Sequence, residues 1–241
     1  MMSLPSEPAD IETSSEEYAR RFAGEAGEYF LEVQTRAVLD LLAPWPRARV
    51  LDVGGGHAQL ALPLVQHGYD VTVVGSSERC RERLDRLLPG GSFRFQSCHL
   101  LALPFAERAF DLVLAFRLLP HAGEWRCLLS EMCRVAESAL VLDYPDRRSF
   151  NFFTETLFGW KKAIEHNTRP YRCFTKAEIL AELSKHNFGR PLLRRQFFVP
   201  MVIHRAVGRQ KFSRSIESLS QALGLRRAFG SPVILRAVRV G

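Results

Sequence analysis

The residues best suited to chemistry lie in one short stretch, Val50–Leu64. Asp52 lies near the end of an apolar run, and three consecutive glycines, Gly54, Gly55 and Gly56, follow that run directly. Apolar residues then recur at helical spacing, so the stretch predicts a strand, a tight turn and a helix. Because glycine has no Cβ, the turn can take a positive φ and let a ligand lie against its backbone. The free N–H groups at the start of a helix suit an anionic group.

Predicted strands and helices alternate around this stretch. The strands cover Arg49–Val53, Asp70–Val74, Phe93–Gln96, Asp111–Ala115, Ala139–Asp143, Leu192–Val199 and Ser231–Arg239. The helices cover Glu16–Ala23, Gly27–Leu42, Gln59–His67, Glu78–Leu88, Trp125–Val135, Thr175–His186 and, as a basic helical segment, Arg205–Leu223. This rhythm indicates the α/β class with a doubly wound sheet, whose last strand returns antiparallel. Right-handed crossovers place a ligand at the carboxyl ends of the first, second and fourth strands.

Two segments fall outside that rhythm. Met1–Thr13 is polar and is expected to be loose, and the spacing of Ser14 and Glu17 is typical of a capping box that starts a helix. The aromatic stretch Phe150–Trp160 has two interpretations, a lid over an apolar substrate pocket or a helix packed on the sheet edge.

Composition limits the class of protein. The chain has 241 residues and is 46% hydrophobic, which suits one domain over 1–241. We divide it into N-terminal helices (14–46), a ligand-binding core (47–143) and a lid with C-terminal strands (144–241). It has neither a signal peptide nor an apolar run long enough to span a bilayer, so we expect a soluble, cytoplasmic protein. The five scattered cysteines have no metal-binding spacing, and we expect no metal site.

The net charge of +7 raises the question of an acidic partner. The basic segment Arg194–Arg214 alternates with apolar residues, a pattern also found in segments that contact anionic lipid or nucleic acid. An arginine-rich solvated surface is the simpler interpretation. We therefore expect no nucleic-acid partner and leave peripheral membrane contact open. The sequence does not indicate the oligomeric state.

The order Asp52-x-Gly54-x-Gly56 resembles motif I of the class I S-adenosylmethionine (SAM)-dependent methyltransferases, in particular the type 11-like branch that acts on small molecules. Ala58 stands where a third glycine is often found. The resemblance extends over Tyr18–Asp143 and implies a Rossmann-like methyltransferase fold with a seven-stranded mixed sheet and SAM as cofactor. It also implies that Asp52 and the glycines hold the amino-acid end of SAM; alternatively, Asp52 only braces the loop.

Two positions depart from the family pattern. The family has an acid at the end of the second strand that accepts from both ribose hydroxyls, whereas this chain has Gly75, followed by Ser76 and Ser77. The serines, or a bridging water, would then bind the ribose more weakly. In the segment that resembles the adenine-binding loop, His99 replaces an aspartate and Leu100 follows it. A neutral histidine can still accept a hydrogen bond from the adenine amino group.

The segment Phe110–His121 matches the family's next motif. The resemblance places Phe116 beside the cofactor and Arg117 beside the substrate. Asp143 and Tyr144, at the end of the fifth strand, are weaker candidates, Tyr144 for substrate contact. His121 could act as the general base for a hydroxyl, or it could only pack or cap the start of a helix.

The resulting hypothesis is methyl transfer from SAM to a small molecule such as a biosynthetic intermediate, a quinone or another lipid-like acceptor. The missing ribose acid motivates an alternative, a non-catalytic or altered-ligand protein of the same fold. A methyltransferase that acts on RNA is a further alternative.

Overall fold

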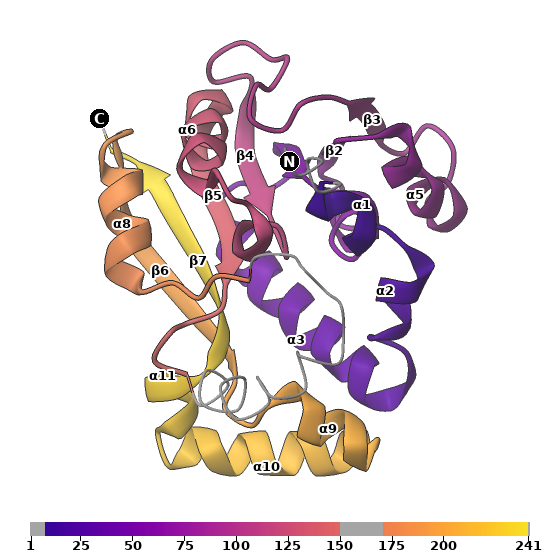
Figure 1. The fold of residues 1–241 in the computed structure, drawn as a ribbon, viewed down its shortest axis with the longest axis vertical. Coiled ribbons are helices and arrows are strands. Elements are labelled where there is room, and N and C mark those ends of the chain that lie inside the picture. The colour runs from indigo at the N-terminus through magenta and orange to yellow at the C-terminus, as the bar shows by residue number, and fades with distance from the viewer. Residues whose placement is uncertain (1–7, 150–170, 241) are drawn as a thin grey trace, which may run out of the picture.

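The computed structural model describes residues 8–149 and 171–240. Within them, seven strands form one sheet in the order β3-β2-β1-β4-β5-β7-β6. Their bounds are β1 (Arg49–Val53), β2 (Asp70–Gly75), β3 (Arg94–Ser97), β4 (Phe110–Ala115), β5 (Ala136–Tyr144), β6 (Phe188–Phe197) and β7 (Ser231–Arg239). Strands β1 to β5 pair in parallel, and β7 runs antiparallel to both β5 and β6. The predicted doubly wound α/β sheet with an antiparallel last strand is therefore confirmed (Figure 1).

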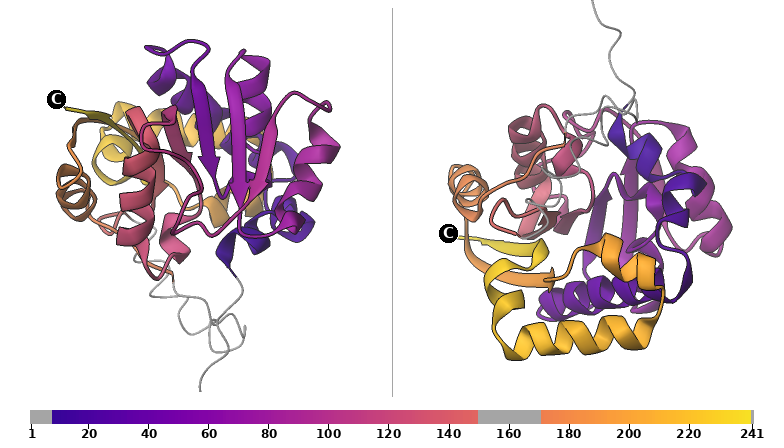
Figure 2. Two further views of the ribbon diagram at one scale, coloured as in Figure 1. Left: turned by 90° about the horizontal axis from the view of Figure 1, so that it is seen from above. Right: turned by 60° about the horizontal axis from the view of Figure 1, so that its bottom comes forward.

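Helices cover both faces of this sheet (Figure 2). The α-helices are α1 (Ala9–Thr13), α2 (Glu16–Arg20), α3 (Gly24–Leu42), α4 (Ala61–Gln66), α5 (Glu82–Leu87), α6 (Trp125–Val135), α8 (Lys176–Ser184), α9 (Met201–Val207), α10 (Gln210–Ala222) and α11 (Leu225–Phe229). Three 3₁₀ turns, η1 (Gly55–His57), η2 (Glu78–Arg81) and η3 (Leu119–His121), follow strands at the carboxyl edge of the sheet.

The alternation of side chains along a strand builds two cores. In β5, Leu140 and Leu142 join the cluster under α6 and α8, whereas Ala139 and Val141 join the cluster under α3, α4 and α5. Because both faces are buried, the strands are continuous apolar runs, as is usual for parallel sheets.

The N-terminal segment differs from the sequence prediction. Residues Ala9–Thr13 form a helix, so the expectation of a loose segment is wrong for that part, because Asp10 is fully buried. The cap of α2 is Ser15, whose Oγ accepts from Tyr18 N at 3.1 Å, and not Ser14. The Ser14 hydroxyl instead donates to Asp10 O at 2.6 Å and so belongs to the end of α1.

The C-terminal segment confirms most of its prediction. Thr175 caps α8 in a complete capping box with Glu178, and β7 has the predicted bounds. The basic segment predicted over Arg205–Leu223 consists of two helices, because Gly208 takes φ +68° and ends α9. Helix α10 then runs beside α3 (Figure 2). The Phe150–Trp160 stretch lies outside the described residues.

All five cysteines are free thiols. Among the described residues, no cluster of histidine, cysteine and acidic side chains is arranged to hold a metal ion. None of the helices in that part of the chain has the length and apolarity needed to cross a membrane.

Candidate functional site

The glycine loop follows β1 at the carboxyl edge of the sheet. Gly54 takes φ +71°, which favours glycine, and its N–H donates to Val74 O at 2.8 Å. A Cβ on Gly55 would stand 2.2 Å from Asp52 Oδ2, so only glycine lets the chain fold back over that carboxylate. Ala58, at the third glycine position, also has a positive φ of 60°. Helix α4 therefore begins only at Ala61, later than predicted.

The carboxylate of Asp52 is buried beneath this loop. The side chain is fully buried, and neither oxygen has a hydrogen-bond partner among the described residues. The interpretation of Asp52 as a brace that accepts from the loop N–H groups is therefore not supported. Burial raises the pKa of Asp52 to about 7, because a charged carboxylate loses its hydration there.

This burial predicts a dependence of stability on pH. A carboxyl whose pKa rises from 3.8 to about 7 on folding binds its proton more tightly in the native state. Its contribution to the unfolding free energy is complete below pH 3.8 and is lost as the pH rises through about 7. The loss should be about 4 kcal/mol.

The contribution of His57 to the unfolding free energy changes in the opposite direction over nearly the same pH range. Burial, followed by the charge of Arg117, lowers its pKa to about 3, so its contribution increases as the pH rises. The contributions of Asp52 and His57 to the unfolding free energy of the wild type therefore nearly cancel as the pH changes. The informative quantity is the difference in urea unfolding free energy between wild type and Asp52→Asn, which should shift by several kcal/mol in favour of the variant as the pH is raised. If this difference stays constant as the pH changes, the pKa of Asp52 does not change on folding.

The end of β2 has no room for the family's ribose-binding acid. A Cβ on Gly75 would stand 2.7 Å from Cys80 Cβ. A carboxylate nevertheless lies there, because Asp10 of α1 accepts from Ser76 N at 2.6 Å and from Ser76 Oγ at 2.7 Å. Ser77 Oγ accepts from Arg79 N at 3.3 Å and caps η2, as the sequence predicts. Asp10 is not among the residues predicted from the sequence, because it stands 66 positions before Ser76.

Helix α1 also touches the glycine loop. A Cβ on Gly56 would stand 2.2 Å from Ser14 Oγ, and a Cβ on Gly54 would stand 3.5 Å from Asp10 Cβ. Cys80 completes the cluster, since its Sγ donates to Asp10 Oδ2 at 3.4 Å. Burial and the charge of Asp10 raise the pKa of Cys80 to about 12, so it stays a thiol donor at neutral pH. Helix α1 thus covers the loop and the end of β2 together.

Arg117 joins the other elements of this edge. It takes φ +58°, and its N–H donates to Asp143 Oδ1 at 2.7 Å. The guanidinium donates to Gln59 Oε1 and Gln34 Oε1, each at 2.7 Å, and lies 4.1 Å from the ring centroid of Phe22. Burial raises the pKa of Asp143, and the charge of Arg117 partly offsets this effect. Arg117 therefore ties the N-terminal helices to the ends of β4 and β5.

The remaining predicted residues lie at different depths. Phe116 and Leu100 are buried in the two cores, and His99 is exposed in the loop after β3. Tyr144 is fully buried, with its ring centroid 6.5 Å from that of Phe174. His121 is half-buried in η3, and its ring centroid lies 5.5 Å from that of Tyr171. The structure thus brings the glycine loop, Ser76 and Arg117 to one edge and encloses Tyr144 in the core.

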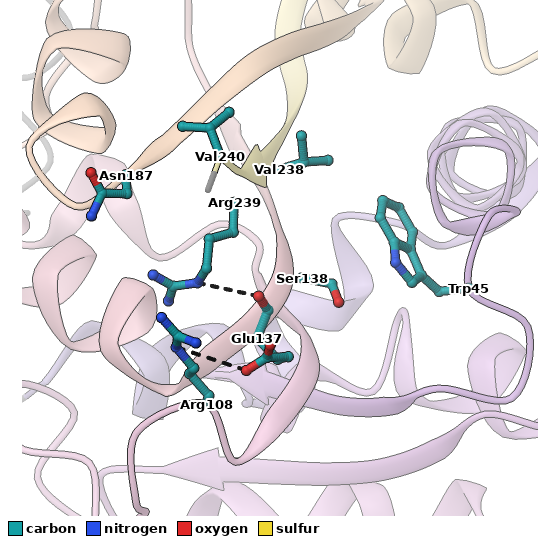
Figure 3. Close-up of a pocket in the computed structure, with 8 residues that line it drawn as sticks. All are labelled: Trp45, Arg108, Glu137, Ser138, Asn187, Val238, Arg239 and Val240. Carbon is teal, nitrogen blue, oxygen red and sulfur yellow. Dashed lines mark hydrogen bonds and ion pairs between the residues drawn. The ribbon is translucent and has the colours of Figure 1, made fainter.

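A separate hollow of about 550 Å³ lies at the opposite, amino edge of β4 and β5 (Figure 3). Both arginines that line it already contact Glu137, one at its backbone oxygen and the other at its carboxylate. Arg239 Nε donates to Glu137 O at 3.2 Å, and Arg108 lies 3.9 Å from the Glu137 carboxylate. This hollow has no glycine loop or unpartnered carboxylate, so the candidate site stays at the carboxyl edge.

Comparison with known proteins supports the family resemblance. Residues 50–138 match the family model described as a methyltransferase domain. An O-methyltransferase of Pyrenophora dematioidea is 30% identical over 125 residues, which cover 49% of this chain and 46% of that protein. The O-methyltransferase cnsE of Penicillium expansum is 30% identical over 124 residues, 46% of this chain and 45% of that protein. The matched region spans about half the length of these curated relatives.

Solved structures show the same fold over nearly the whole chain. Magnesium protoporphyrin IX methyltransferase of Synechocystis PCC 6803, crystallised with bound SAH, has a TM-score of 0.63 at 18% identity and covers 93% of this chain and 94% of its own. A possible histamine N-methyltransferase of Thermotoga maritima has a TM-score of 0.65 at 17% identity, with coverage of 95% and 98%. Residues 50–138 are therefore similar to the methyltransferase domain, and the sheet built around them has the fold of these solved methyltransferases.

Proposed function

We propose that this chain transfers the methyl group of SAM to a small-molecule acceptor. The observation that carries the proposal is the glycine loop after β1, closed over a buried carboxylate that has no hydrogen-bond partner in residues 8–149 and 171–240. The names of the curated relatives, O-methyltransferases, favour a hydroxyl group as the acceptor. The proposal for the acceptor rests on those names, because the relatives match over only half of their length.

The residues at the carboxyl edge fit the polar groups of SAM. Asp52 and the loop backbone would hold the amino-acid end, because an ammonium group needs a carboxylate or carbonyl oxygens and a carboxylate needs N–H donors. At the end of β2, Ser76 and Asp10 would meet the ribose hydroxyls. His99 and Leu100 would border the adenine. When bound, SAM supplies a methyl group on a sulfonium, a leaving group that needs no proton.

The protein's own task is to position the acceptor and exclude water. Arg117 would border the acceptor, because it lies at the end of β4 and is held in place by Asp143, Gln59 and Gln34. His121, two residues beyond the buried Leu119, would take the proton from an acceptor hydroxyl. Since Ser14 and Asp10 lie against the loop, α1 would border the bound cofactor.

Calorimetric titration with SAM tests the proposal. We expect wild type to bind SAM and S-adenosylhomocysteine, and to transfer a labelled methyl group from SAM to members of a panel of phenols and lipid-like hydroxy compounds. Asp10→Asn should weaken SAM binding by about 10- to 100-fold, because the variant loses a charged hydrogen-bond acceptor for the ribose hydroxyls. Asp40→Asn, an exposed change on α3, is the matched control and should bind normally.

Each of these measurements has a result that would contradict the proposal. If wild type gives no heat and no thermal shift at millimolar SAM, the chain is a protein of the same fold without this cofactor. Tighter SAM binding by Asp10→Asn would show that Asp10 competes with the ribose and does not bind it. Methyl transfer to RNA in place of the phenols would overturn the small-molecule acceptor.

A further inference from the structure

Helix α10 presents its polar side to the protein. Ser213, Glu217 and Ser220 are buried and recur at helical spacing on one side of the helix. They meet His204 of α9, which is also fully buried. His204 Nδ1 lies 2.9 Å from Ser213 Oγ, and His204 Nε2 lies 3.1 Å from Glu217 Oε1.

An adjacent side of α10, about a quarter of a turn around the helix from the buried side, is apolar and exposed to solvent. Phe212, Leu219 and Leu223 are 39%, 60% and 65% exposed. Together with the partly buried Ile216 they follow the i, i+4, i+7, i+11 pattern, so they form one stripe along the helix. A surface helix normally packs its apolar stripe against the core of its own chain. This stripe is therefore suited to contact with an apolar environment outside the chain.

Exposed apolar side chains gather on this one segment. Of the ten large hydrophobic residues exposed in the described chain, seven lie between Met201 and Phe229, a run that contains α9, α10 and α11. They are Val202, Ile203, Val207, Phe212, Leu219, Leu223 and Phe229, which we call the outer apolar surface. The three helices lie together at one end of the molecule (Figures 1 and 2). A cluster of this kind marks an interaction site more often than scattered apolar residues do.

The same run carries most of the net positive charge. Between Met201 and Phe229 there are six basic residues and one acidic residue, so the run holds five of the seven net positive charges. Its acid is Glu217, which is buried with His204. Arg209, Lys211 and Arg227 are exposed and form no ion pair with any described residue. The surface therefore combines exposed apolar side chains with basic side chains that form no ion pair among the described residues, although Arg214 beside them pairs with Glu32 of α3.

We propose that the outer apolar surface binds peripherally to an anionic lipid bilayer. Helices with apolar residues on one side and lysine or arginine beside them lie in the membrane interface, where acyl chains meet the apolar residues and headgroups meet the basic ones. A second copy of this chain is a poorer partner, because a symmetric dimer would bring two strongly basic surfaces together. The proposal is independent of the methyl-transfer proposal.

Flotation with lipid vesicles tests this proposal. The full chain should bind vesicles of phosphatidylcholine with phosphatidylglycerol, bind pure phosphatidylcholine weakly, and lose affinity as salt is added. Leu219→Gln/Leu223→Gln should weaken partitioning by about tenfold or more, because both side chains leave the acyl region. Lys211→Gln/Arg227→Gln should have a similar effect on anionic vesicles only. Leu87→Gln/Leu192→Gln removes exposed leucines elsewhere and should bind like wild type.

Three results would overturn the proposal. The first is no flotation of wild type with anionic vesicles, and the second is an equal loss in the Leu87/Leu192 control. The third is a wild-type dimer in light scattering that Leu219→Gln/Leu223→Gln converts to monomer, which would assign the surface to a second copy. SAM affinity should stay unchanged in all these variants, so a failed lipid test leaves the methyltransferase proposal intact.

Discussion

Gly55→Ala is expected to lower SAM affinity by at least about 100-fold. The added Cβ would stand 2.2 Å from Asp52 Oδ2 and 2.3 Å from Asp52 Cγ. The buried Asp52 side chain cannot swing into solvent, so the loop must open instead and lose the shape that lets a ligand lie on its backbone. Calorimetric titration with SAM, on protein whose far-UV circular dichroism matches wild type, measures the effect.

Gly90→Ala is the matched control for this change. Gly90 has no positive φ, and a Cβ there meets nothing within 4 Å, so its SAM affinity and stability should equal those of wild type. Adding Asp52→Ala to Gly55→Ala removes the clash and should restore loop closure, seen as a recovery of unfolding free energy. Wild-type SAM affinity in Gly55→Ala alone would disprove the assignment of the cofactor site to this loop.

Glu217→Ala should lower the unfolding free energy by about 3–5 kcal/mol. The carboxylate accepts from Phe198 N at 3.1 and 3.0 Å and from Val199 N at 2.9 Å, and it contacts His204 and Ser220. Burial alone would raise the pKa of Glu217, but these hydrogen bonds outweigh it and hold the pKa below its usual range. Its removal leaves several buried donors unsatisfied at once, which costs more than one lost hydrogen bond.

Urea unfolding at neutral pH measures this loss. Ser218→Ala, an exposed change on the next residue of α10, should alter the unfolding free energy by less than about 0.5 kcal/mol. Glu217→Gln retains one acceptor oxygen and should fall between the two. A loss below about 1 kcal/mol in Glu217→Ala would mean that α9 and α10 are held mainly by their other contacts.

Local sequence alone was enough to predict most elements of the fold. The apolar runs and turn residues place β1, α6 and β7 with the bounds that the structure has. The glycines after Val53 predict the loop, because positive φ and close approach are properties of a single residue type. What the sequence could not supply at that loop is Asp10, which reaches Ser76 only after α1 folds back across the end of β2.

The direction of a side chain at a strand end also depended on tertiary structure. Asp143 and Tyr144 are adjacent, and both ranked as candidates in the sequence. Alternation along β5 turns Asp143 toward Arg117 and encloses Tyr144 beside Phe174. The sequence does not show where β5 ends at the carboxyl edge of the sheet, so it cannot tell whether Asp143 or Tyr144 faces the site.

The sequence by itself determined that the segment containing α10 is helical and basic and that the glycine loop ends the first strand, because both properties follow from residue types and their spacing. It did not determine which side of α10 is buried. The fold settled that question by placing His204 where Ser213 and Glu217 can satisfy its ring nitrogens, which turns the polar side inward and leaves Leu219 and Leu223 outside. The physical reason is that buried polar groups need partners, and those partners are brought together only by the tertiary structure.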